Sequence, residues 1–349
     1  MGLIVLADDG IEFDGHSPRN GPLGGVESSI VNLAEWLVRL GHTVRVRNMC
    51  REAKMISGVD WAPLFINGSY NLPRNADLYI ANRGDRLIDL MPEAKRTVFW
   101  IHNPAQYILK WRYLSKLWRL KPAIIFIGNY HASTYPSWAP GGDRIVIPYG
   151  ISEEFCEYAP REDLPRQRAI FTSNPLRSLE WLLQVWVDHI FPRVPGAELH
   201  LFSGSETYGN TGAKKKSDME KVLKKARDFA QHGIVLRGPV SKPLLIKEFR
   251  ESRVMLYRGD LNETFCLAVG EAQAAGVPAV VQELGSVVER VIDGETGSIV
   301  KTDTEFIESA IKLLKDDEVW WRQHNAALAK QRLWNWEKAA KSFEELMVS

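Results

Sequence analysis

The sequence predicts an α/β protein built from two doubly wound parallel-sheet domains. Short apolar stretches typical of buried strands alternate with amphipathic helical stretches through both halves of the chain, which is the order expected of parallel sheets covered by helices. The 349 residues fit two domains, each large enough for its own core. A charged, proline-containing stretch, Ser152 to Gln167, separates the halves and is the predicted linker.

Composition narrows the class of protein. A hydrophobic content of 45% and a charged content of 25% are ordinary for a globular chain, and a net charge of +1 gives no global reason to expect nucleic acid as a partner. Three cysteines without a C-x-x-C pair argue against a disulfide framework or a zinc site and for a reducing cytoplasm. We expect no signal peptide, because the first residues lack a basic flank. Apolar runs stay below the roughly 18 to 20 residues of a membrane span, so any membrane role would be peripheral.

The first half begins with a βαβ unit. A strand over Leu3 to Ala7 is followed by a long glycine-rich loop, Asp8 to Gly25, a helix over Glu27 to Leu40 and a strand over Thr43 to Arg47. Backbone N–H groups at the start of such a helix can hold phosphate. Gly24 and Gly25 are therefore candidates, although their spacing is not the G-x-G-x-x-G fingerprint.

Further strands are predicted over Asp77 to Asn82, Thr97 to Ile101 and Ala123 to Gly128. His102 and His131 follow the last two of them, where a polar side chain can face a cleft. Each histidine is either part of a functional site or a hydrogen-bonding residue of purely structural importance.

Residues 107–121 hold five cations, four aromatic residues and no acid. As a helix this segment is basic and amphipathic, which suits anionic lipid headgroups or an acidic acceptor. The alternative is a solvated cationic helix whose aromatic residues pack on the sheet.

The second half alternates in the same way. Strands are predicted over Arg168 to Thr172, Glu198 to Ser203, Ile234 to Leu236 and Arg253 to Tyr257. The predicted helices are Ser178 to Phe191, with Ser178 as N-cap, Lys214 to Gln231, Pro243 to Glu251, Ser286 to Ile292, Thr304 to Lys315, Glu318 to Arg332 and Glu337 to Val348.

The most informative stretch runs from Arg258 to Val281 and contains two carboxylates, Glu263 and Glu271. Cys266 to Ala275 has the composition of a helix, closed by Gly276 and followed by a buried strand over Val277 to Val281. Glu263 then lies just before the helix and Glu271 inside it, in the loop–helix–strand arrangement that carries ligand sites in open α/β sheets. Alternatively, Glu271 solvates a helix face and Glu263 is a first-turn acid favoured by the helix dipole.

Taken together, these motifs resemble the GT-B glycosyltransferases of family 4, a group of retaining enzymes. The resemblance covers nearly the whole chain, and the E-x7-E element carries most of it. The matching segments are Gly24-Gly25-Val26-Glu27, Leu33-Ala34, Gly41-His42-Thr43-Val44, Ile147-Pro148-Tyr149-Gly150-Ile151, Gly238-Pro239-Val240, Asn262-Glu263 through Glu271-Ala272 to Gly276-Val277-Pro278, Gly285, and Asp293-Gly294-Glu295-Thr296-Gly297.

The resemblance implies a role for each matching position. Glu271 is similar to the carboxylate that binds the donor ribose, and Glu263 to the one that faces the donor sugar, with the backbone of Thr264, Phe265 and Cys266 near sugar and phosphate. His102 would contact the donor sugar, Gly24 and Gly25 would lie where diphosphate and acceptor approach, and Val240 would line the base pocket. Arg177 fits the position of the family's lysine, but Thr172 or Ser173 holds that of its arginine. The diphosphate site is then one cation short, unless Lys242 or another basic residue turns inward.

The resemblance also implies a fold and a reaction. The fold is GT-B, with two Rossmann-like domains facing across a cleft: residues 1–155 with the terminal helix 337–349 for the acceptor, and residues 156–336 for the donor. The reaction is retaining transfer of a hexose or related sugar from a UDP- or GDP-sugar, with Glu263, His102 and Arg177 as catalytic residues and a glycan or lipid-linked acceptor. No Asp-x-Asp follows a strand, so we expect no metal requirement. The alternatives are a sugar-nucleotide hydrolase or epimerase, a binding protein without turnover, or a peripheral membrane module using residues 107–121.

Overall fold

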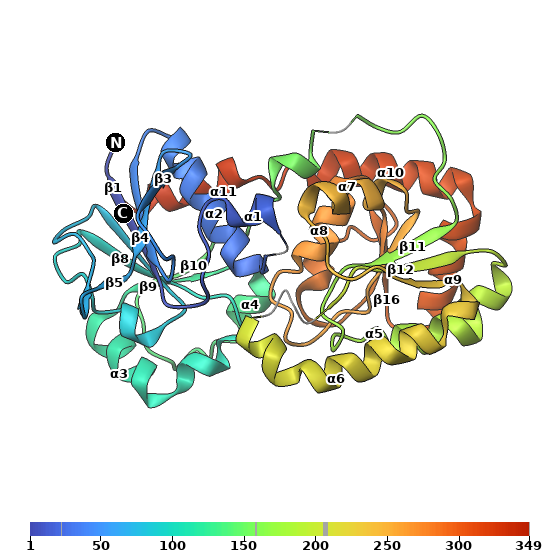
Figure 1. Ribbon diagram of the computed structural model, residues 1–349, viewed down its shortest axis with the longest axis horizontal. Helices are drawn as coiled ribbons and strands as arrows, with labels where there is room; N and C mark the ends of the chain where they lie inside the picture. Colours follow the sequence, from blue (N-terminus) through green and yellow to red (C-terminus); the bar gives the residue numbers. More distant parts are fainter. Residues whose placement is uncertain (22, 158, 205–208, 349) are drawn as a thin grey trace. The chain divides into compact units, whose positions relative to one another are not determined.

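A computed structural model of the protein describes residues 1–348 except 22, 158 and 205–208 (Figure 1). Contacts divide it into two units. The first comprises residues 1–18, 25–150 and 335–349, and the second comprises residues 19–24 and 151–334. Apart from the short excursion at residues 19–24, the chain passes between the units after Gly150 and again after Trp334, where the sequence analysis placed the boundaries at 155 and 336.

The first unit contains an eight-stranded sheet in the order β10-β9-β8-β7-β1-β2-β4-β3, parallel except for the β3–β4 pair. The order reverses between β1 and β7, the arrangement of a doubly wound sheet. Its strands are β1 (Leu3–Asp8), β2 (Thr43–Asn48), β3 (Lys54–Ile56), β4 (Val59–Pro63), β7 (Leu78–Asn82), β8 (Arg96–Trp100), β9 (Ala123–Phe126) and β10 (Arg144–Val146).

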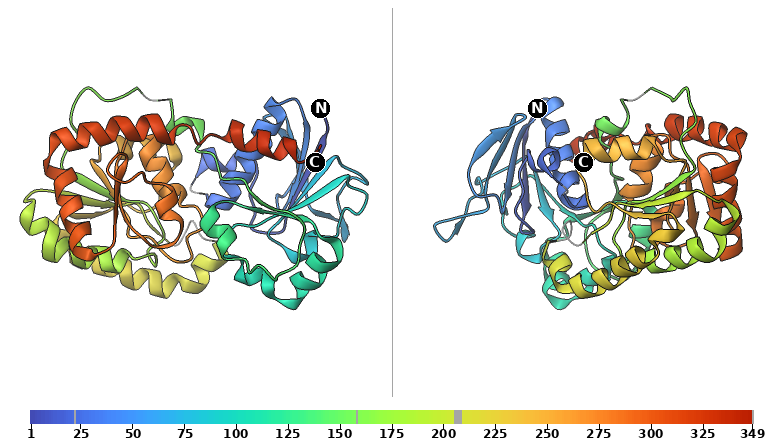
Figure 2. Two further views of the ribbon diagram at one scale, coloured as in Figure 1. Left: turned by 180° about the vertical axis from the view of Figure 1, so that it is seen from behind. Right: turned by 45° about the vertical axis from the view of Figure 1, so that its right-hand side comes forward.

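Helices cover both faces of this sheet. α2 (Gly25–Arg39) and α11 (Trp336–Glu345) pack together on one face, and α3 (Trp111–Leu120) lies on the other (Figures 1 and 2). Shorter helical segments are α1 (Ser17–Asn20), α4 (Asn129–Ser133) and 3₁₀ turns at Asp85–Leu87 and Ala105–Leu109. The basic segment 107–121 is therefore α-helical only from Trp111 to Leu120, and its first residues belong to the second of these 3₁₀ turns.

Two hairpins in this unit were missed by the sequence analysis. β3 and β4 are joined by Ser57 and Gly58, and a small separate hairpin, β5 (Phe65–Ile66) with β6 (Ser69–Tyr70), is joined by Asn67 and Gly68. All four joining residues have φ between 50° and 80°, as a two-residue type I′ turn requires. Asn-Gly is a strong hairpin signal, so the β5–β6 turn was predictable.

The second unit contains a six-stranded parallel sheet in the order β13-β12-β11-β14-β15-β16. Numbered from β11, this is the order 3-2-1-4-5-6 of a dinucleotide-binding Rossmann sheet, with its switch point between β11 and β14. Its strands are β11 (Arg168–Phe171), β12 (Glu198–Leu201), β13 (Ile234–Leu236), β14 (Val254–Leu256), β15 (Ala279–Gln282) and β16 (Gly297–Val300). The predicted strands are confirmed with ends shifted by one or two residues.

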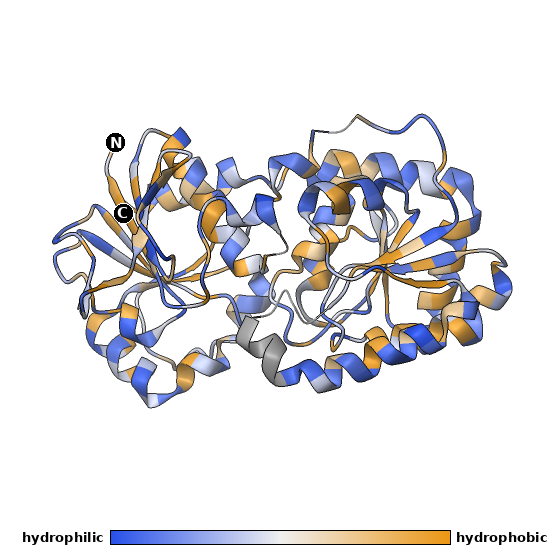
Figure 3. Cartoon of the chain, viewed as in Figure 1, coloured by the Kyte–Doolittle hydropathy of each residue, from blue (hydrophilic) through white to orange (hydrophobic). Residues whose placement is uncertain are grey.

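Helices again lie on both faces, α5 and α6 on one and α7 and α8 on the other (Figure 1). Most alternate hydrophobic and hydrophilic residues along their length, as amphipathic packing requires (Figure 3). The helices are α5 (Leu179–Val185), α6 (Gly209–Asp228), α7 (Lys242–Arg250), α8 (Leu267–Ala274), α9 (Asp303–Lys315) and α10 (Asp317–Gln331).

Two helix predictions in this unit were wrong in detail. The helix expected over 178–191 continues as a π-helical segment, Trp186–Ile190. Ser178 occupies the predicted N-cap position, but its hydroxyl donates to Gly259 O at 3.1 Å instead of accepting from a helix N–H. The helix expected over 286–292 is a 3₁₀ turn, Gly285–Glu289. In both places, tertiary contacts decide the local conformation.

The terminal helix α11 belongs to the first unit. His42 Nε2 lies 3.0 Å from Glu344 Oε1, and the Trp100 and Phe343 rings pack edge to face with centroids 5.2 Å apart. None of the helices within the described residues is long and apolar enough to cross a membrane.

Candidate functional site

Glu263 lies in the loop between β14 and α8, at the carboxyl edge of the second sheet. Only 7% of it is exposed. Its Oε2 accepts hydrogen bonds from the Arg177 guanidinium and, at 3.0 Å, from the Tyr257 hydroxyl, while Oε1 accepts one from the Cys266 N–H at 3.3 Å. Burial, reinforced by the Glu263 charge, raises the pKa of Tyr257 well above its usual value, so the phenol remains a donor. Three donors therefore fix this carboxylate.

Arg177 and Glu263 meet at the topological switch point of the second sheet. Arg177 follows β11 and Glu263 follows β14, and these two strands are neighbours whose connections leave in opposite directions. In open α/β sheets this is where ligands bind, because the diverging loops leave a crevice there. The sequence placed both residues at strand ends but did not predict their ion pair.

Glu271 lies within α8 and pairs with Lys242, the first residue of α7. The Lys242 ammonium is 2.5 Å from Glu271 Oε1 and 5.4 Å from the Phe155 ring centroid. Lys242 does turn inward, as the sequence analysis allowed, but it turns toward a carboxylate. Glu263 in the loop before α8 and Glu271 in the helix itself thus each form an ion pair with a basic residue.

The residues between the two glutamates are buried. Cys266 is the N-cap of α8 and adopts φ 63°, a left-handed conformation that side chains other than glycine seldom take. Burial raises the pKa of its thiol well above the usual value, so Cys266 is not a reactive thiolate. Thr264 and Phe265 are also buried.

The remaining predicted donor residues lie in the same unit. Ser173 is buried just after β11, where its carbonyl accepts a hydrogen bond from the Ser203 hydroxyl. Val240 precedes α7 and packs against the core. The Thr172 hydroxyl, at one of the two positions where the resemblance leads one to expect an arginine, has no hydrogen-bond partner among the described residues.

In the first unit, His102 belongs to a buried polar network at the carboxyl ends of β1, β7 and β8. Arg83 binds Asp8 Oδ1 at 2.9 Å and Glu27 Oε1 at 2.9 Å, and Asn82 Nδ2 donates to Asp8 Oδ1 at 2.6 Å. His102 Nε2 lies 2.5 Å from Asn82 Oδ1. β1 and β7 flank the switch point of this sheet, so this network occupies the same topological position as the Arg177–Glu263 pair.

The network fixes the tautomer of His102. Because Asn82 donates through Nδ2, its Oδ1 can only accept, so His102 Nε2 carries the proton. Burial, together with the charge of Arg83, holds the pKa of His102 well below its usual value. The imidazole is therefore neutral, and its Nδ1 accepts from the Tyr149 hydroxyl.

Sequence reasoning identified His102 but not its partners Asp8, Asn82, Arg83 and Tyr149. The available signal was the polar residue at the end of each of β1 and β7. Gly25 is the first residue of α2, as expected for a loop that opens a helix, and Gly24 precedes it.

His131 is a structural histidine of this unit. Its Nδ1 accepts the Ile127 N–H at 3.2 Å and its Nε2 donates to Asn103 O at 2.8 Å, and burial lowers its pKa to about 4. A neutral imidazole is needed in the fold, whereas the unfolded chain takes up a proton below about pH 6.5. His131 thus contributes stability that is complete above about pH 6.5 and is lost as the pH falls toward 4.

We expect this loss to reach roughly 3 kcal/mol, at about 1.4 kcal/mol per pH unit. Urea unfolding of wild type and His131→Gln between pH 7 and 4 measures it, and the variant should show the shallower decline. His16→Gln, at an exposed position, is the control. Parallel curves for wild type and His131→Gln would contradict this role.

α3 presents an exposed aromatic surface. Trp111 is 80% exposed and Trp118 72%. With Ser115, Arg119 and Lys121 they line a hollow of about 460 Å³. The sequence segment holds no acid, but the fold supplies two: Asp89 binds Lys116 at 2.7 Å and Asp85 binds Arg112 at 3.3 Å. Part of the cationic charge is therefore neutralised, while the tryptophans remain exposed.

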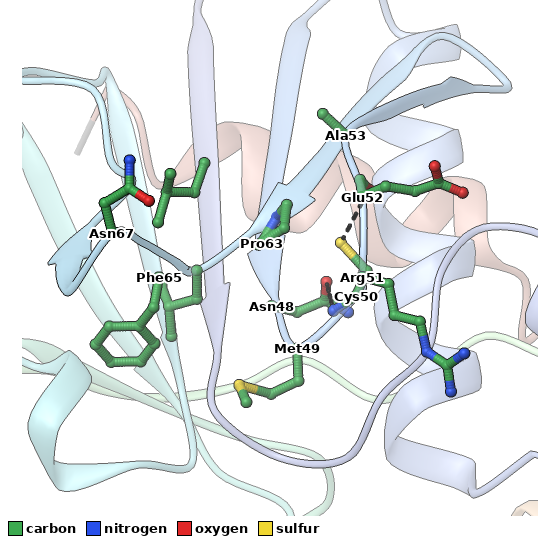
Figure 4. A pocket seen from close by; sticks show the side chains of 11 residues that line it. Asn48, Met49, Cys50, Arg51, Glu52, Ala53, Pro63, Phe65 and Asn67 are labelled. Carbon is green, nitrogen blue, oxygen red and sulfur yellow. Dashed lines mark hydrogen bonds between the residues drawn. The ribbon is translucent and has the colours of Figure 1, made fainter.

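A second hollow, of about 580 Å³, lies at the carboxyl ends of β2 and β4 (Figure 4). Met49, from the loop after β2, and Phe65, from the β5–β6 hairpin, form part of its lining. Asn48 and Cys50 at its base are already hydrogen-bonded, to Phe13 O and Glu52 O. The hollow thus offers apolar walls at the edge where a Rossmann-like sheet binds ligands.

Comparison with known proteins shows what the chain is similar to. Residues 168–316 match the sequence model of the family described as glycosyl transferases group 1. The lipopolysaccharide 1,2-N-acetylglucosaminetransferase of Salmonella typhimurium is 23% identical over 240 residues, which are 64% of this chain and 61% of that enzyme. The alignment therefore leaves more than a third of the Salmonella enzyme unmatched.

Solved structures match over the whole chain. The sucrose-phosphate synthase of Thermosynechococcus elongatus superimposes with a TM-score of 0.75 at 16% identity, covering 99% of this chain and 98% of that one. An Anabaena protein, Alr3699/HepE, in complex with UDP-glucose gives 0.72 at 13% identity, covering 99% of each chain. At this identity the likeness shows the fold, which is GT-B with two Rossmann-like domains.

Proposed function

We propose that the protein is a glycosyltransferase that moves a hexose or related sugar from a nucleotide-diphosphate sugar to an acceptor. The observation that carries the proposal is the pair Arg177–Glu263 at the β11–β14 switch point, inside the segment similar to group 1 glycosyltransferases. The UDP-glucose complex of the Anabaena structure supports a nucleotide-sugar donor. The hollow at the ends of β2 and β4 supports acceptor binding by residues 1–150.

The proposed chemistry needs stabilisation of two charges. Cleavage of the anomeric C–O bond builds negative charge on the diphosphate and positive charge on the sugar. Arg177 and the N–H groups at the start of α8 would stabilise the first, and Glu263 would face the second. Arg177 already binds Glu263, and it would contact the phosphate while this bond to Glu263 remains.

We further propose that the reaction follows the family 4 pattern, with retention of configuration and no metal. The leaving phosphate takes the proton of the acceptor hydroxyl as the new bond forms on the same face of the sugar. NMR of the first-formed product tests retention by its anomeric coupling, and activity after exhaustive chelation tests metal independence. The proposed location is the cytoplasm.

The donor can be found by a thermal-shift screen across UDP-, GDP-, ADP- and TDP-sugars, because a ligand that binds the native state raises the unfolding midpoint. Release of nucleoside diphosphate with the stabilising donor is then measured with and without candidate acceptors. Release that depends on acceptor supports transfer. Release without acceptor supports the alternative of a hydrolase or epimerase, and binding without release supports a sugar-nucleotide-binding protein.

The two glutamates should affect different kinetic parameters. Glu271→Gln should chiefly weaken nucleotide binding, because Glu271 is assigned to the ribose, and Glu263→Gln should chiefly lower turnover, because Glu263 faces the sugar. Calorimetric Kd values and kcat for both variants check this division. Equal losses of both parameters in both variants would contradict it.

A second candidate function is peripheral binding to anionic membranes through α3, favoured by the exposure of Trp111 and Trp118. Basic amphipathic helices with exposed tryptophan bind the interface of anionic bilayers. The same contact would serve a lipid-linked acceptor.

Liposome sedimentation tests this candidate. The double variant Trp111→Ala/Trp118→Ala should lose about tenfold or more in partition to vesicles rich in anionic lipid, since burying a large apolar side chain is worth roughly 1.5–3 kcal/mol. Trp138→Ala, which removes another exposed tryptophan, is the matched control. Reversal of charge at Lys110, Arg112, Lys116 and Arg119 should have a further effect, and unchanged partition of both variants would rule the contact out.

A further inference from the structure

Arg290, at the C-cap of the 3₁₀ turn Gly285–Glu289, is a buried cation with no hydrogen-bond acceptor. It is 3% exposed, and its Nε, Nη1 and Nη2 all lack a partner among the described residues. Its guanidinium carbon lies 4.1 Å from the Phe265 ring centroid and 3.9 Å from that of Trp334. The guanidinium therefore stacks on two aromatic rings but satisfies none of its five N–H donors.

The 3₁₀ turn that carries Arg290 is docked against the loop of Glu263. Ser286 N donates to Glu263 O at 3.2 Å, and Gly285 lies so close to Asp260 O that a Cβ there would be 2.1 Å away. The Ser286 hydroxyl is fully buried and also lacks a partner among the described residues. The side chains of Arg290 and Ser286, both without a hydrogen-bond partner among the described residues, thus lie next to the loop that carries Glu263.

Arg290 lies beside the start of α8. It stacks on Phe265, the residue before the N-cap, and its charge acts on the Cys266 thiol. At this point the N-terminal N–H groups of α8 already favour an anion. Arg177 approaches the same loop through Glu263.

Burying a guanidinium that has no hydrogen-bond partner among the described residues is costly, and the charge of the adjacent Glu289 offsets only part of that cost. Burial lowers the pKa of Arg290 to about 10, which leaves it charged at neutral pH. Cation–π contacts with two rings recover only part of the free energy that is lost when the ion is removed from water. Binding of an anion would offset this cost, and this explains why the Arg290 guanidinium is buried here.

We propose that Arg290 is the second cation of the donor site and binds the diphosphate of the nucleotide sugar together with Arg177. This inference rests on the proposed function. Arg177 contacts the loop before α8 through Glu263, and Arg290 contacts it through Phe265. A planar guanidinium suits this role, because it donates two parallel hydrogen bonds to phosphate oxygens.

The test compares diphosphates with their nucleosides by isothermal titration: UDP with uridine, GDP with guanosine, ADP with adenosine and TDP with thymidine. Wild type should bind one diphosphate more tightly than its nucleoside. Arg290→Gln should weaken that diphosphate by about 10- to 100-fold, the range for hydrogen bonds to a charged group, and the nucleoside by less than about twofold. Arg290→Lys, which keeps the charge, should fall between the two and serves if the glutamine variant does not fold.

Arg258→Gln is the matched control, because Arg258 also stacks on a ring, that of Trp181 at 4.7 Å, but donates from its Nε to Gln282 at 2.7 Å. It should leave the preference for diphosphate unchanged. Equal weakening of diphosphate and nucleoside by Arg290→Gln would make Arg290 a packing residue and overturn the inference, as would no weakening. If wild type prefers no diphosphate over its nucleoside, the proposed function itself fails.

Discussion

Replacing Arg177 by alanine should lower the rate of sugar transfer by about 10²–10³-fold, the cost of removing one preorganised group that stabilises developing negative charge. Arg177 is fixed for this task at the β11–β14 switch point by its bond to Glu263. Single-turnover kinetics with the donor found by thermal shift measures the effect. Arg193→Ala removes an arginine of the same unit whose ion pair with Glu308 lies at the surface, and should leave the rate unchanged.

The alanine variant also deprives a buried carboxylate of its cation. Removing one partner of a fully buried ion pair costs about 3–5 kcal/mol, but the Arg177 side chain is 34% exposed, and Tyr257 and the Cys266 N–H still bind Glu263, so we expect a smaller loss. The unfolding midpoint must therefore be measured in parallel. Arg177→Lys keeps the charge and separates the two effects: a folded lysine variant with full activity would show that charge alone suffices, and a folded alanine variant with full activity would refute the role of Arg177.

Gly150→Ala should destabilise the first unit by several kcal/mol. An alanine Cβ at this position would lie 2.2 Å from Trp336 N and 2.3 Å from Asn335 C. Both are backbone atoms of the returning chain, so neither can move aside as a side chain can, and overpacking of this kind typically costs about 1–3 kcal/mol or more. The chain segments that leave and re-enter the first unit thus pack against each other at Gly150, and glycine is the only residue type that fits there.

Urea unfolding followed by the intrinsic tryptophan fluorescence of the whole chain measures the loss. Gly21→Ala is the control, because a Cβ there meets nothing within 4 Å, and its midpoint should match wild type. A wild-type midpoint for Gly150→Ala would mean that the returning segment can shift at little cost.

The sequence was sufficient to predict the fold class because the strands and helices that define it are specified by local sequence patterns. Apolar strands, capped helices and their alternation specify two doubly wound sheets, and the stretch around Glu263 and Glu271 placed loop, helix and strand within one or two residues of their positions in the structure. The missed β3–β6 strands are short and are specified by turn residues such as Asn67 and Gly68 rather than by hydrophobic pattern. Cys266 in a left-handed conformation was beyond prediction, because only tertiary packing holds it there.

For the site residues, the sequence predicted a position at the end of a strand but not the neighbours in space. His102 was identified from its position, but its partners Asp8 and Asn82 come from other strands, and no sequence spacing links them. The same holds for Lys242 with Glu271 and for Arg290 between Phe265 and Trp334. The sequence likewise did not predict that Asp85 and Asp89 are the counterions of α3. Ion pairs between distant segments depend on the assembled sheet, and sequence periodicity carries no information about them.

The non-contiguous first unit has a consequence for synthesis on the ribosome. Residues 335–349, which include α11, emerge after all of the second unit has been made. Domains generally fold as they emerge, the N-terminal one first, but here the first unit lacks its last helix until translation reaches that point. The second unit can therefore complete its fold earlier, and the α2 face that α11 covers remains exposed to chaperones in the interval.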